Sequence, residues 1–307
     1  MSGTKISVVI PTYNRQSLLN RAIGSVLSQT LSSLTLEVIV VDDCSLIPAD
    51  VSCFNDERIK LIRMGENAGP QIARNTGTRQ ATGDWVVMLD DDDELVAGAL
   101  EKALFNIKSV EYYTEYPVFF FATTNGRIPK SFKLIGPVDI MNGNLYGDFT
   151  PVLNRLLFLQ NNFQYINFPE IHGVGCEQLT WLHISSKILI PSFMVVLVKV
   201  NHDAPMRLTS YDNFIRNSYK FALQQDITID FVRGLRLGEL APGFIEKKRL
   251  GAAIYYLVSG HKKLCRARLK AQGRRMHGIN RLMGLLSYFP VFIPRFIFLK
   301  YKRLFSG

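Results

Sequence analysis

An apolar stretch that ends in four consecutive aspartates constrains this chain more than any other feature. The five residues Trp85–Leu89 are typical of a short strand that is buried on both faces of a sheet. Asp90–Asp93 follow directly, and four adjacent carboxylates repel one another unless a counter-charge holds them. Mg²⁺ or Mn²⁺ is the expected counter-charge, because both prefer oxygen ligands. The alternative is a solvated acidic turn before a helix that begins near Glu94, since negative charge stabilises a helix N-terminus.

Apolar strands alternate with amphipathic helices along the chain. Strands are predicted at 6–10, 36–41, 59–63, 85–89, 117–123 and 193–198. Helices are predicted at 18–27, 71–80, 100–107 and 149–160, and turns at 142–144 and 146–148. In the second helix, Ile72, Ala73 and Thr76 are expected to face inward. The alternation predicts an α/β fold: a mostly parallel, Rossmann-like sheet with helices on both faces.

Three of the predicted strands end in polar residues, at Pro11–Arg15, Asp42–Ser45 and Asp90–Asp93. The carboxyl ends of parallel strands lie along one edge of the sheet, where open α/β folds bind their ligands. Since a cation held by carboxylates often carries substrate phosphates, this edge is expected to bind a nucleotide. Neither GxGxxG nor GxxxxGK[ST] follows any of these strands, which disfavours a dinucleotide-binding fold and a P-loop.

Four blocks of this region resemble the family-2 glycosyltransferases. They are VVIPTYNR at 8–15, VIVVDDCS at 38–45, NAGPQIARNTG at 67–77 and ATGDWVVMLDDDD at 81–93. The resemblance implies a GT-A fold and an inverting transfer of a sugar from a nucleotide-diphosphate donor, expected to be UDP-linked, with Mg²⁺ or Mn²⁺ as cofactor. It is strong over the first 110 residues and weaker to about residue 210. We therefore expect a GT-A domain at 1–210, with nucleotide-sugar binding in 1–110 and the acceptor side in 111–210.

The resemblance also implies the residues of the site. Those expected to bind the nucleotide sugar are Pro11, Thr12, Tyr13, Arg15, Asp42, Asp43, Asn67, Gly69, Arg74, Asn75, Asp90 and Asp91. Those expected to bind the metal are Asp92, Asp93 and His202. Other interpretations stay open for some of them: a core aromatic for Tyr13, helix caps for Asp42 and Asp43, and a structural role for His202.

The segment 168–182 is similar to the family's block that carries the catalytic base. An inverting transfer needs a carboxylate within hydrogen-bond reach of the acceptor hydroxyl. Gln178 stands where the family has an aspartate, and an amide cannot accept a proton. Glu177 is therefore the expected base, while Glu170 and Asp148 stay open. A helix cap is the alternative interpretation of Glu177.

The C-terminal part, 211–307, is predicted to be a helical, basic, membrane-associating region. From Lys247 to the end there are 15 Lys and Arg and no Asp or Glu, although the whole chain carries 36 basic and 26 acidic residues. The apolar stretch 279–299 is interrupted by two prolines and two arginines, which favours a helix lying in an anionic membrane surface over one that spans the bilayer. The alternatives are a short transmembrane or re-entrant segment and a solvated helix with an ordinary core stripe. Nucleic acid is not an expected partner, because the first domain is acidic and offers no companion motif.

The expected function is transfer of a sugar to a glycan acceptor that is lipid-linked, such as a saccharide on undecaprenyl diphosphate or a lipid-A core. The four cysteines have no CxxC or CxxxC spacing, and Met1 is followed by a strand pattern rather than a leader pattern. A peripheral location on the cytoplasmic side of the inner membrane is therefore expected. A non-catalytic module or scaffold that binds sugar nucleotides is the alternative, suggested by Gln178. A nucleotidyltransferase is disfavoured, because Pro11–Arg15 is not a glycine-rich basic loop.

Overall fold

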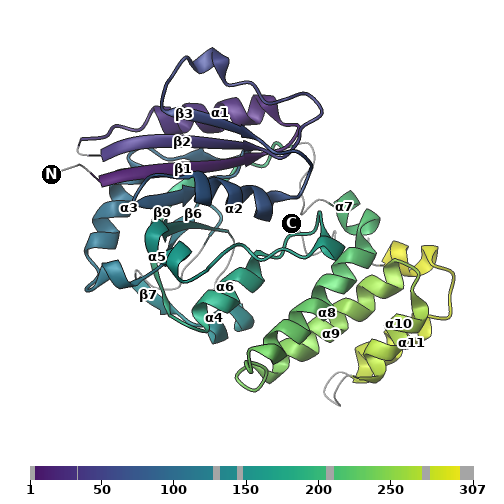
Figure 1. Ribbon diagram of the computed structural model, residues 1–307. Coiled ribbons are helices and arrows are strands. Elements are labelled where there is room, and N and C mark those ends of the chain that lie inside the picture. The colour runs from purple at the N-terminus through teal and green to yellow at the C-terminus, as the bar shows by residue number, and fades with distance from the viewer. Residues whose placement is uncertain are drawn as a thin grey trace. The chain divides into compact units, whose positions relative to one another are not determined.

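A computed structural model describes residues 4–32, 34–126, 132–143, 148–204, 211–271 and 277–297 (Figure 1). The chain divides into two compact units, which are described separately. The first unit comprises 1–167 and 180–205, and the second comprises 168–179 and 206–307. The segment 168–179, expected in the first domain, thus belongs with the C-terminal helices. The predicted domain boundary at 210 lies outside the described residues.

The first unit is built on a mixed sheet in the order β3-β2-β1-β4-β8-β6-β9-β5, with β7 also paired to β9. Its strands are β1 (Thr4–Thr12), β2 (Leu34–Asp42), β3 (Ile59–Arg63), β4 (Trp85–Met88), β5 (Glu94–Leu95), β6 (Val118–Thr123), β7 (Phe132–Ile135), β8 (Phe149–Asn154) and β9 (Ile190–Lys199). The strands β5, β7 and β8 run against the others. The predicted mostly parallel sheet is confirmed, and its β3-β2-β1-β4 part is parallel throughout.

Helices cover both faces of this sheet, as predicted (Figure 1). They are α1 (Gln16–Leu27), α2 (Pro70–Gln80), α3 (Ala99–Lys108), α4 (Pro137–Asn142), α5 (Arg155–Gln160) and α6 (Glu177–Ser185, of which 180–185 belong to this unit), with short 3₁₀ turns at Ser52–Phe54 and Tyr113–Glu115. On one face, Val8 of β1 shares a core cluster with Ile23 of α1 and Leu100 of α3. On the other face, α2 approaches β1 and β2 closely at Gly77. The strands β1, β2 and β4 are therefore largely buried on both sides, whereas the edge strand β3 is partly exposed.

One predicted helix is wrong in its bounds, for a non-local reason. The segment 149–160, predicted as one helix, is strand β8 followed by α5, because 149–154 pairs with both β4 and β6. Asn154 then begins the helix by accepting a hydrogen bond from the amide of Leu157 (3.3 Å). A helix that begins near Glu94 belonged to the alternative of a solvated acidic turn, and Glu94 instead pairs with Lys199 in β5. Helix α3 begins at Ala99, after Gly98 in the left-handed region (φ 67°), which agrees with the helix predicted at 100–107.

Two further predictions about local structure are only partly met. In α2 the predicted inward face holds for Ala73, whereas Ile72 and Thr76 are half-buried. The predicted turn at 142–144 begins where Gly143 ends α4 with a positive φ of 69°, and Asn144 lies outside the described residues. Most of the predicted turn at 146–148 lies there as well.

The second unit is helical, as predicted for the C-terminal region. It contains α7 (Tyr211–Arg216), α8 (Ser218–Gly234), α9 (Pro242–Val258), α10 (Lys262–Lys270) and α11 (His277–Leu286). Asp226 of α8 accepts hydrogen bonds from the Tyr256 hydroxyl of α9 (2.7 Å) and from Arg268 of α10 (2.7 and 2.8 Å). One carboxylate thus links three helices around a core that includes Ala252 and Cys265. Within the described residues, no helix is both long and apolar enough to span a bilayer.

Gly77 offers a test of the packing of α2 on the sheet. A Cβ at Gly77 would lie 2.3 Å from Val9 Cγ1, so Gly77→Ala is expected to lower the free energy of unfolding of the first unit by about 1–3 kcal/mol through overpacking. Gly24 in α1 is the matched control, because a Cβ there meets nothing within 4 Å. Gly24→Ala is expected to stabilise the unit by about 0.5–1 kcal/mol.

Urea unfolding followed by tryptophan fluorescence measures this difference, since both tryptophans, Trp85 and Trp181, lie in the first unit. Equal midpoints for the two variants would contradict the close approach of α2 to β1.

Candidate active site

The carboxyl ends of β1, β2 and β4 lie next to one another because these strands are adjacent and parallel. Thr12 pairs with Asp42, and the amide of Asp43 donates to the Thr12 carbonyl (2.9 Å). On the other side of β1, the amide of Leu89 donates to the Val9 carbonyl (3.0 Å). The polar strand ends expected at one edge of the sheet therefore meet there.

Asp91 faces the interior of the protein, unlike the aspartates around it. It is 4% exposed and accepts hydrogen bonds from Thr12 Oγ1 (2.8 Å) and Arg15 Nη1 (2.9 Å). Burial raises the pKa of Asp91 to about 6, while the contacts with Arg15 and Thr12 act in the opposite direction. Thr12, Arg15 and Asp91, all predicted at the nucleotide sugar, thus join the acidic turn to the loop that follows β1.

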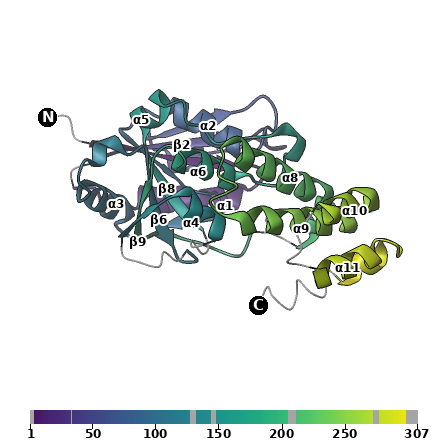
Figure 2. The ribbon, with the colours of Figure 1, turned by 90° about the horizontal axis from the view of Figure 1, so that it is seen from below.

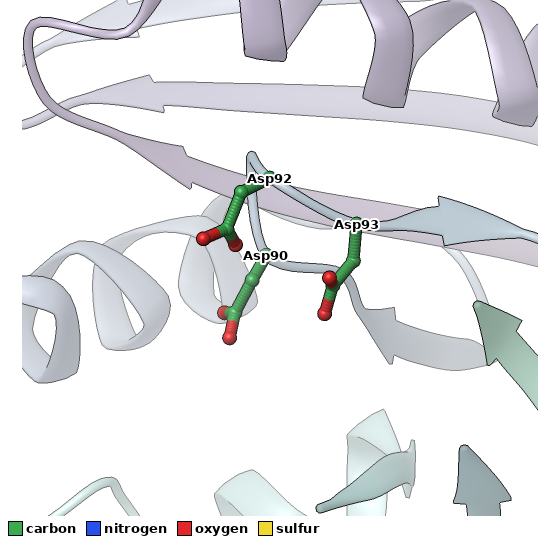
Figure 3. A group of neighbouring side chains, drawn as sticks. All are labelled: Asp90, Asp92 and Asp93. Carbon is green, nitrogen blue, oxygen red and sulfur yellow. The ribbon is translucent and has the colours of Figure 1, made fainter. Parts of the chain in front are cut away.

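The carboxylates of Asp90, Asp92 and Asp93 extend from one turn toward the same side (Figure 3). One oxygen from each lies within 4.8 Å of the others. Octahedral Mg²⁺ holds oxygen ligands at about 2.1 Å, so opposite ligands are about 4 Å apart. The separation of the three oxygens is close to that spacing. The three residues therefore fit a divalent cation, and Asp90, predicted at the nucleotide sugar, joins the predicted metal ligands Asp92 and Asp93.

The negative charges of this turn repel one another. Burial is the main reason that the pKa of Asp93 is raised to about 7, and the negative charges of Asp90, Asp92 and Asp148 add to it. The backbone amide of Asn201, which donates to Asp93 Oδ1 (3.0 Å), lowers the pKa. A cation bound between these carboxylates would relieve the repulsion.

Three residues that the sequence did not single out hold the acidic turn in place. The side-chain amide of Asn201 donates to the Asp92 carbonyl (3.1 Å) and to Glu94 Oε1 (3.0 Å). Arg21 Nη2 donates to the same Asp92 carbonyl (2.8 Å). The carboxylate of Asp203 accepts hydrogen bonds from both terminal nitrogens of Arg21 (2.5 and 2.9 Å). In the sequence, the position of Asn201 beside His202 is only a weak indication that Asn201 belongs to the site. Arg21 lies within a predicted helix, and no pattern in the sequence indicates its contact with the acidic turn.

The two aspartates at the end of β2 organise loops. Asp42 accepts hydrogen bonds from the amides of Ser45 (2.9 Å) and Ala49 (3.1 Å) and pairs with Arg63 Nη1 (2.6 Å). Burial acts to raise the pKa of Asp42, but these partners lower it below its ordinary value. Asp43 accepts from the amides of Ala68 (2.9 Å) and Gly69 (2.8 Å), which places 67–69 beside β2. Their predicted contacts with a nucleotide stay predictions.

Helix α2 places the guanidinium of Arg74 beside the acidic turn. Arg74 Nη2 donates to Asp90 Oδ1 (2.6 Å), and its guanidinium lies over the Tyr165 ring, 5.6 Å from the centroid. Asn75 is buried and exchanges two hydrogen bonds with the backbone of Tyr165 (2.7 and 2.8 Å). Arg74 thus borders the acidic cluster, whereas the side chain of Asn75 is engaged with the 165 segment. Gly69, just before α2, has a φ of 91°, which favours glycine.

The remaining predicted residues of the first unit lie as follows. Tyr13 is 39% exposed and so is not a core aromatic, whereas Pro11 is buried in β1. A ring nitrogen of His202 lies 3.1 Å from Asn125 Nδ2. Among the described residues, the group of ligand atoms within 4.8 Å comprises the three aspartates and not His202, whose metal role stays a prediction.

The three candidate bases fall in different parts of the chain. Glu177 begins α6, and Glu170 is exposed in the 3₁₀ turn Pro169–Ile171; both belong to the second unit. Asp148 immediately precedes β8 in the first unit, and its charge contributes to the raised pKa of Asp93. Gln178, the residue that departs from the family pattern, accepts a hydrogen bond from Lys248 Nζ (3.0 Å). The choice of base stays a prediction.

This chain is similar to known proteins in sequence and in fold. The model of the family "Glycosyl transferase family 2" matches residues 7–168. A Campylobacter jejuni protein named GalNAc(5)-diNAcBac-PP-undecaprenol beta-1,3-glucosyltransferase is 33% identical over 193 residues, covering 59% of this chain and 59% of that protein. An uncharacterized glycosyltransferase of Rickettsia conorii is 32% identical over 215 residues, covering 65% of this chain and 33% of that protein. The chain thus spans from about a third to three-fifths of the length of these relatives.

Two solved structures share the fold. S. aureus TarS 1-349 in complex with UDP-GlcNAc has a TM-score of 0.57 at 17% identity, covering 93% of this chain and 89% of that one. The mannosyltransferase PcManGT from Pyrobaculum calidifontis, in complex with GDP-Man and Mn²⁺, has a TM-score of 0.55 at 16% identity, covering 98% of this chain and 87% of that one. At these identities the likeness shows the GT-A fold alone.

Asn201→Ala tests the support of the acidic turn. The variant loses both side-chain hydrogen bonds to 92–94, so the three carboxylates should become less well oriented, and Mn²⁺ affinity should fall about tenfold or more. Titration of the protein with Mn²⁺ alone, followed by electron paramagnetic resonance of the free ion, measures the change. Asn106→Ala is the matched control, because the Asn106 amide donates within its own helix, to the Lys102 carbonyl. An Asn201 variant that binds Mn²⁺ as the control does would contradict this role.

Proposed function

Because the chain belongs to glycosyl transferase family 2, we propose that it transfers a sugar from a nucleotide-diphosphate donor to a hydroxyl of a glycan, with inversion and with a divalent cation. The observation that carries this proposal is the cluster of Asp90, Asp92 and Asp93 at the carboxyl ends of β1 and β4. This is the edge of an open α/β sheet at which a ligand is expected to bind.

The donor is proposed to be a UDP-sugar bound across the ends of the parallel strands. Tyr13 is exposed at the end of β1 and offers an aromatic surface to a base, while Asp43 stands at the end of β2. The two structural neighbours are complexes with UDP-GlcNAc and with GDP-Man, which supports a nucleotide-diphosphate sugar and leaves the identity of the nucleobase to the experiment. Arg15 and Arg74, both within hydrogen-bond reach of the acidic turn, add positive charge where a diphosphate would bind.

The proposed mechanism is a direct displacement at the anomeric carbon. Mg²⁺ or Mn²⁺, held by Asp90, Asp92 and Asp93, would neutralise charge on the departing diphosphate. The buried Asp91 keeps the loop after β1 against the acidic turn, so the three ligands need little reorganisation. A carboxylate, proposed to be Glu177, takes the proton of the acceptor hydroxyl as the new bond forms.

The acceptor is proposed to be a lipid-linked saccharide, and the site of action the cytoplasmic face of the inner membrane. Support comes from the C. jejuni relative, which is named for a saccharide on PP-undecaprenol. The absence of acidic residues after Glu246 also supports a place beside an anionic membrane.

A second candidate is a module that binds sugar nucleotides without turnover. Gln178 favours it, because an amide stands in the place of the family's carboxylate and is hydrogen-bonded to Lys248 rather than poised as a base. The two candidates share the donor site and differ only in whether a carboxylate accepts the proton.

Asp92→Asn tests the donor and metal site. Removal of one charge from the cluster should weaken metal binding and reduce turnover by about 10²-fold or more, because charge on the departing diphosphate is then less well neutralised. Release of the nucleoside diphosphate from a panel of nucleotide sugars, with Mn²⁺ and a lipid extract, measures turnover. Glu111→Gln, which changes an exposed acid in the turn that follows α3, is the control. Full activity of Asp92→Asn, with no metal requirement, would refute the proposal.

Three single variants identify the base. Glu177→Gln is expected to lower kcat by about 10²–10⁴-fold and to remove the acidic limb of the pH profile, with donor binding unchanged. Glu170→Gln and Asp148→Asn should retain kcat close to that of the wild type. A loss confined to one of these two variants would transfer the role to it. Donor binding without turnover in the wild type, with any donor and acceptor, would support the non-catalytic module.

A further inference from the structure

The C-terminal end of the described chain exposes many large apolar side chains. Of the twenty large hydrophobic residues that are exposed in the described residues, six are leucines or aromatics within 282–296: Leu282, Leu285, Tyr288, Phe289, Phe292 and Phe296. Their exposed fractions run from 48% to 74%. Exposed apolar residues scattered singly are ordinary, whereas so many in one short segment indicate an interaction surface. Helix α11 and the residues after it, to 297, form this segment (Figure 2).

The exposed side chains are not needed to fold the second unit. The same segment has an inner side, on which Met283, Leu286 and Ile293 pack against a cluster that includes Tyr256 and Cys265. The Ser287 hydroxyl receives a hydrogen bond from Arg266 Nη1 (3.2 Å), and Arg295 Nε donates to the Val258 carbonyl (2.8 Å). The segment is thus fastened to α9 and α10 through one side. The apolar side chains on its outer side are therefore additional to those that pack the segment onto the unit.

The charges around this segment select its partner. No Asp or Glu occurs after Glu246, whereas 15 Lys and Arg do. Among the described residues Lys263, Lys270 and Arg281 are exposed on α10 and α11. A second copy of this chain would bring like charges together. A nucleic acid would attract the basic residues but would leave the exposed leucine and phenylalanine side chains without an apolar partner. An anionic lipid surface satisfies both features, because its headgroups attract the basic residues and its acyl boundary accepts the apolar ones.

We propose that the apolar side chains of Leu282, Leu285, Phe289 and Phe292 dip into the acyl boundary of an anionic bilayer, with the segment lying in the plane of the membrane surface. The exposed basic residues of α10 and α11 lie at headgroup level. The structure goes beyond the expectation from sequence by dividing the apolar residues of this region into an inner set that builds the unit and an outer set that binds lipid. This inference does not rest on the proposed transfer reaction.

Vesicle sedimentation of the full chain tests the surface. The wild type should pellet with vesicles of phosphatidylglycerol and phosphatidylcholine and much less with phosphatidylcholine alone. The triple variant Leu285→Ser, Phe289→Ser, Phe292→Ser should reduce the partition coefficient by about tenfold or more, without a change in net charge. The variant Lys263→Gln, Lys270→Gln, Arg281→Gln should reduce only the additional binding that phosphatidylglycerol confers.

A matched triple variant serves as the control. Phe105→Ser, Leu156→Ser, Leu240→Ser removes three apolar residues that are as exposed (77%, 58% and 55%) but lie elsewhere in the chain, and it should pellet as the wild type does. Circular dichroism confirms that each variant is folded. Because no nucleotide is present, an inactive enzyme would still pellet, which separates this test from that of the proposed function.

Three outcomes would overturn the proposal. The first is pelleting of the Leu285, Phe289 and Phe292 variant at the wild-type level. The second is equal binding of the wild type to neutral and anionic vesicles. The third is a wild type that is dimeric by light scattering without vesicles and that the apolar triple variant makes monomeric, since the surface would then join two copies of the chain.

Discussion

The pairing of buried Asp91 with Thr12 and Arg15 is the interaction on which the arrangement of the site depends. Four consecutive carboxylates cannot share one small volume without a large electrostatic cost. The fold turns one of them inward, where a hydroxyl and a guanidinium lie within 2.9 Å, and leaves three directed to a common side. The inward aspartate holds the turn against the end of β1, and the outward three offer the geometry of a cation site.

The rest of the edge is held by a second layer of polar contacts. Asp43 holds the loop before α2, Asn75 holds the segment at Tyr165, and Asn201 holds the acidic turn. Each bond joins segments that are distant in the sequence, and each satisfies a backbone group. A site that binds a highly charged ligand gains from such rigidity, because its dipoles and charges need not reorganise when the ligand arrives. Several residues expected at the donor therefore have a structural function that can be seen directly.

The two units differ in electrostatic character. From Lys247 onward the chain contains Lys and Arg but no Asp or Glu, while the remainder carries more acidic than basic residues. An acidic site needs a cation before it can bind a diphosphate, and a basic helical unit needs none to approach an anionic surface. The proposed metal dependence and the proposed membrane attraction thus rest on separate parts of one chain. If Glu177 is the catalytic carboxylate, it belongs to the second unit, because α6 begins within 168–179.

Local patterns in the sequence were sufficient for the β1–α1–β2 region, the parallel strands and the position of the acidic run, because each depends on periodicity and on turn residues close in the chain. Residues 149–154 were predicted as helix and form a strand, because their conformation is decided by pairing with β4 and β6 on either side. The inward turn of Asp91 and the contacts of Asn201 and Arg21 with Asp92 were equally out of reach. These contacts span 71 to 109 residues of sequence. The sequence by itself determined which chemical groups stand at the strand ends, and only the tertiary structure decided which of four identical carboxylates is buried, because burial depends on the partners that the whole fold brings to each of them.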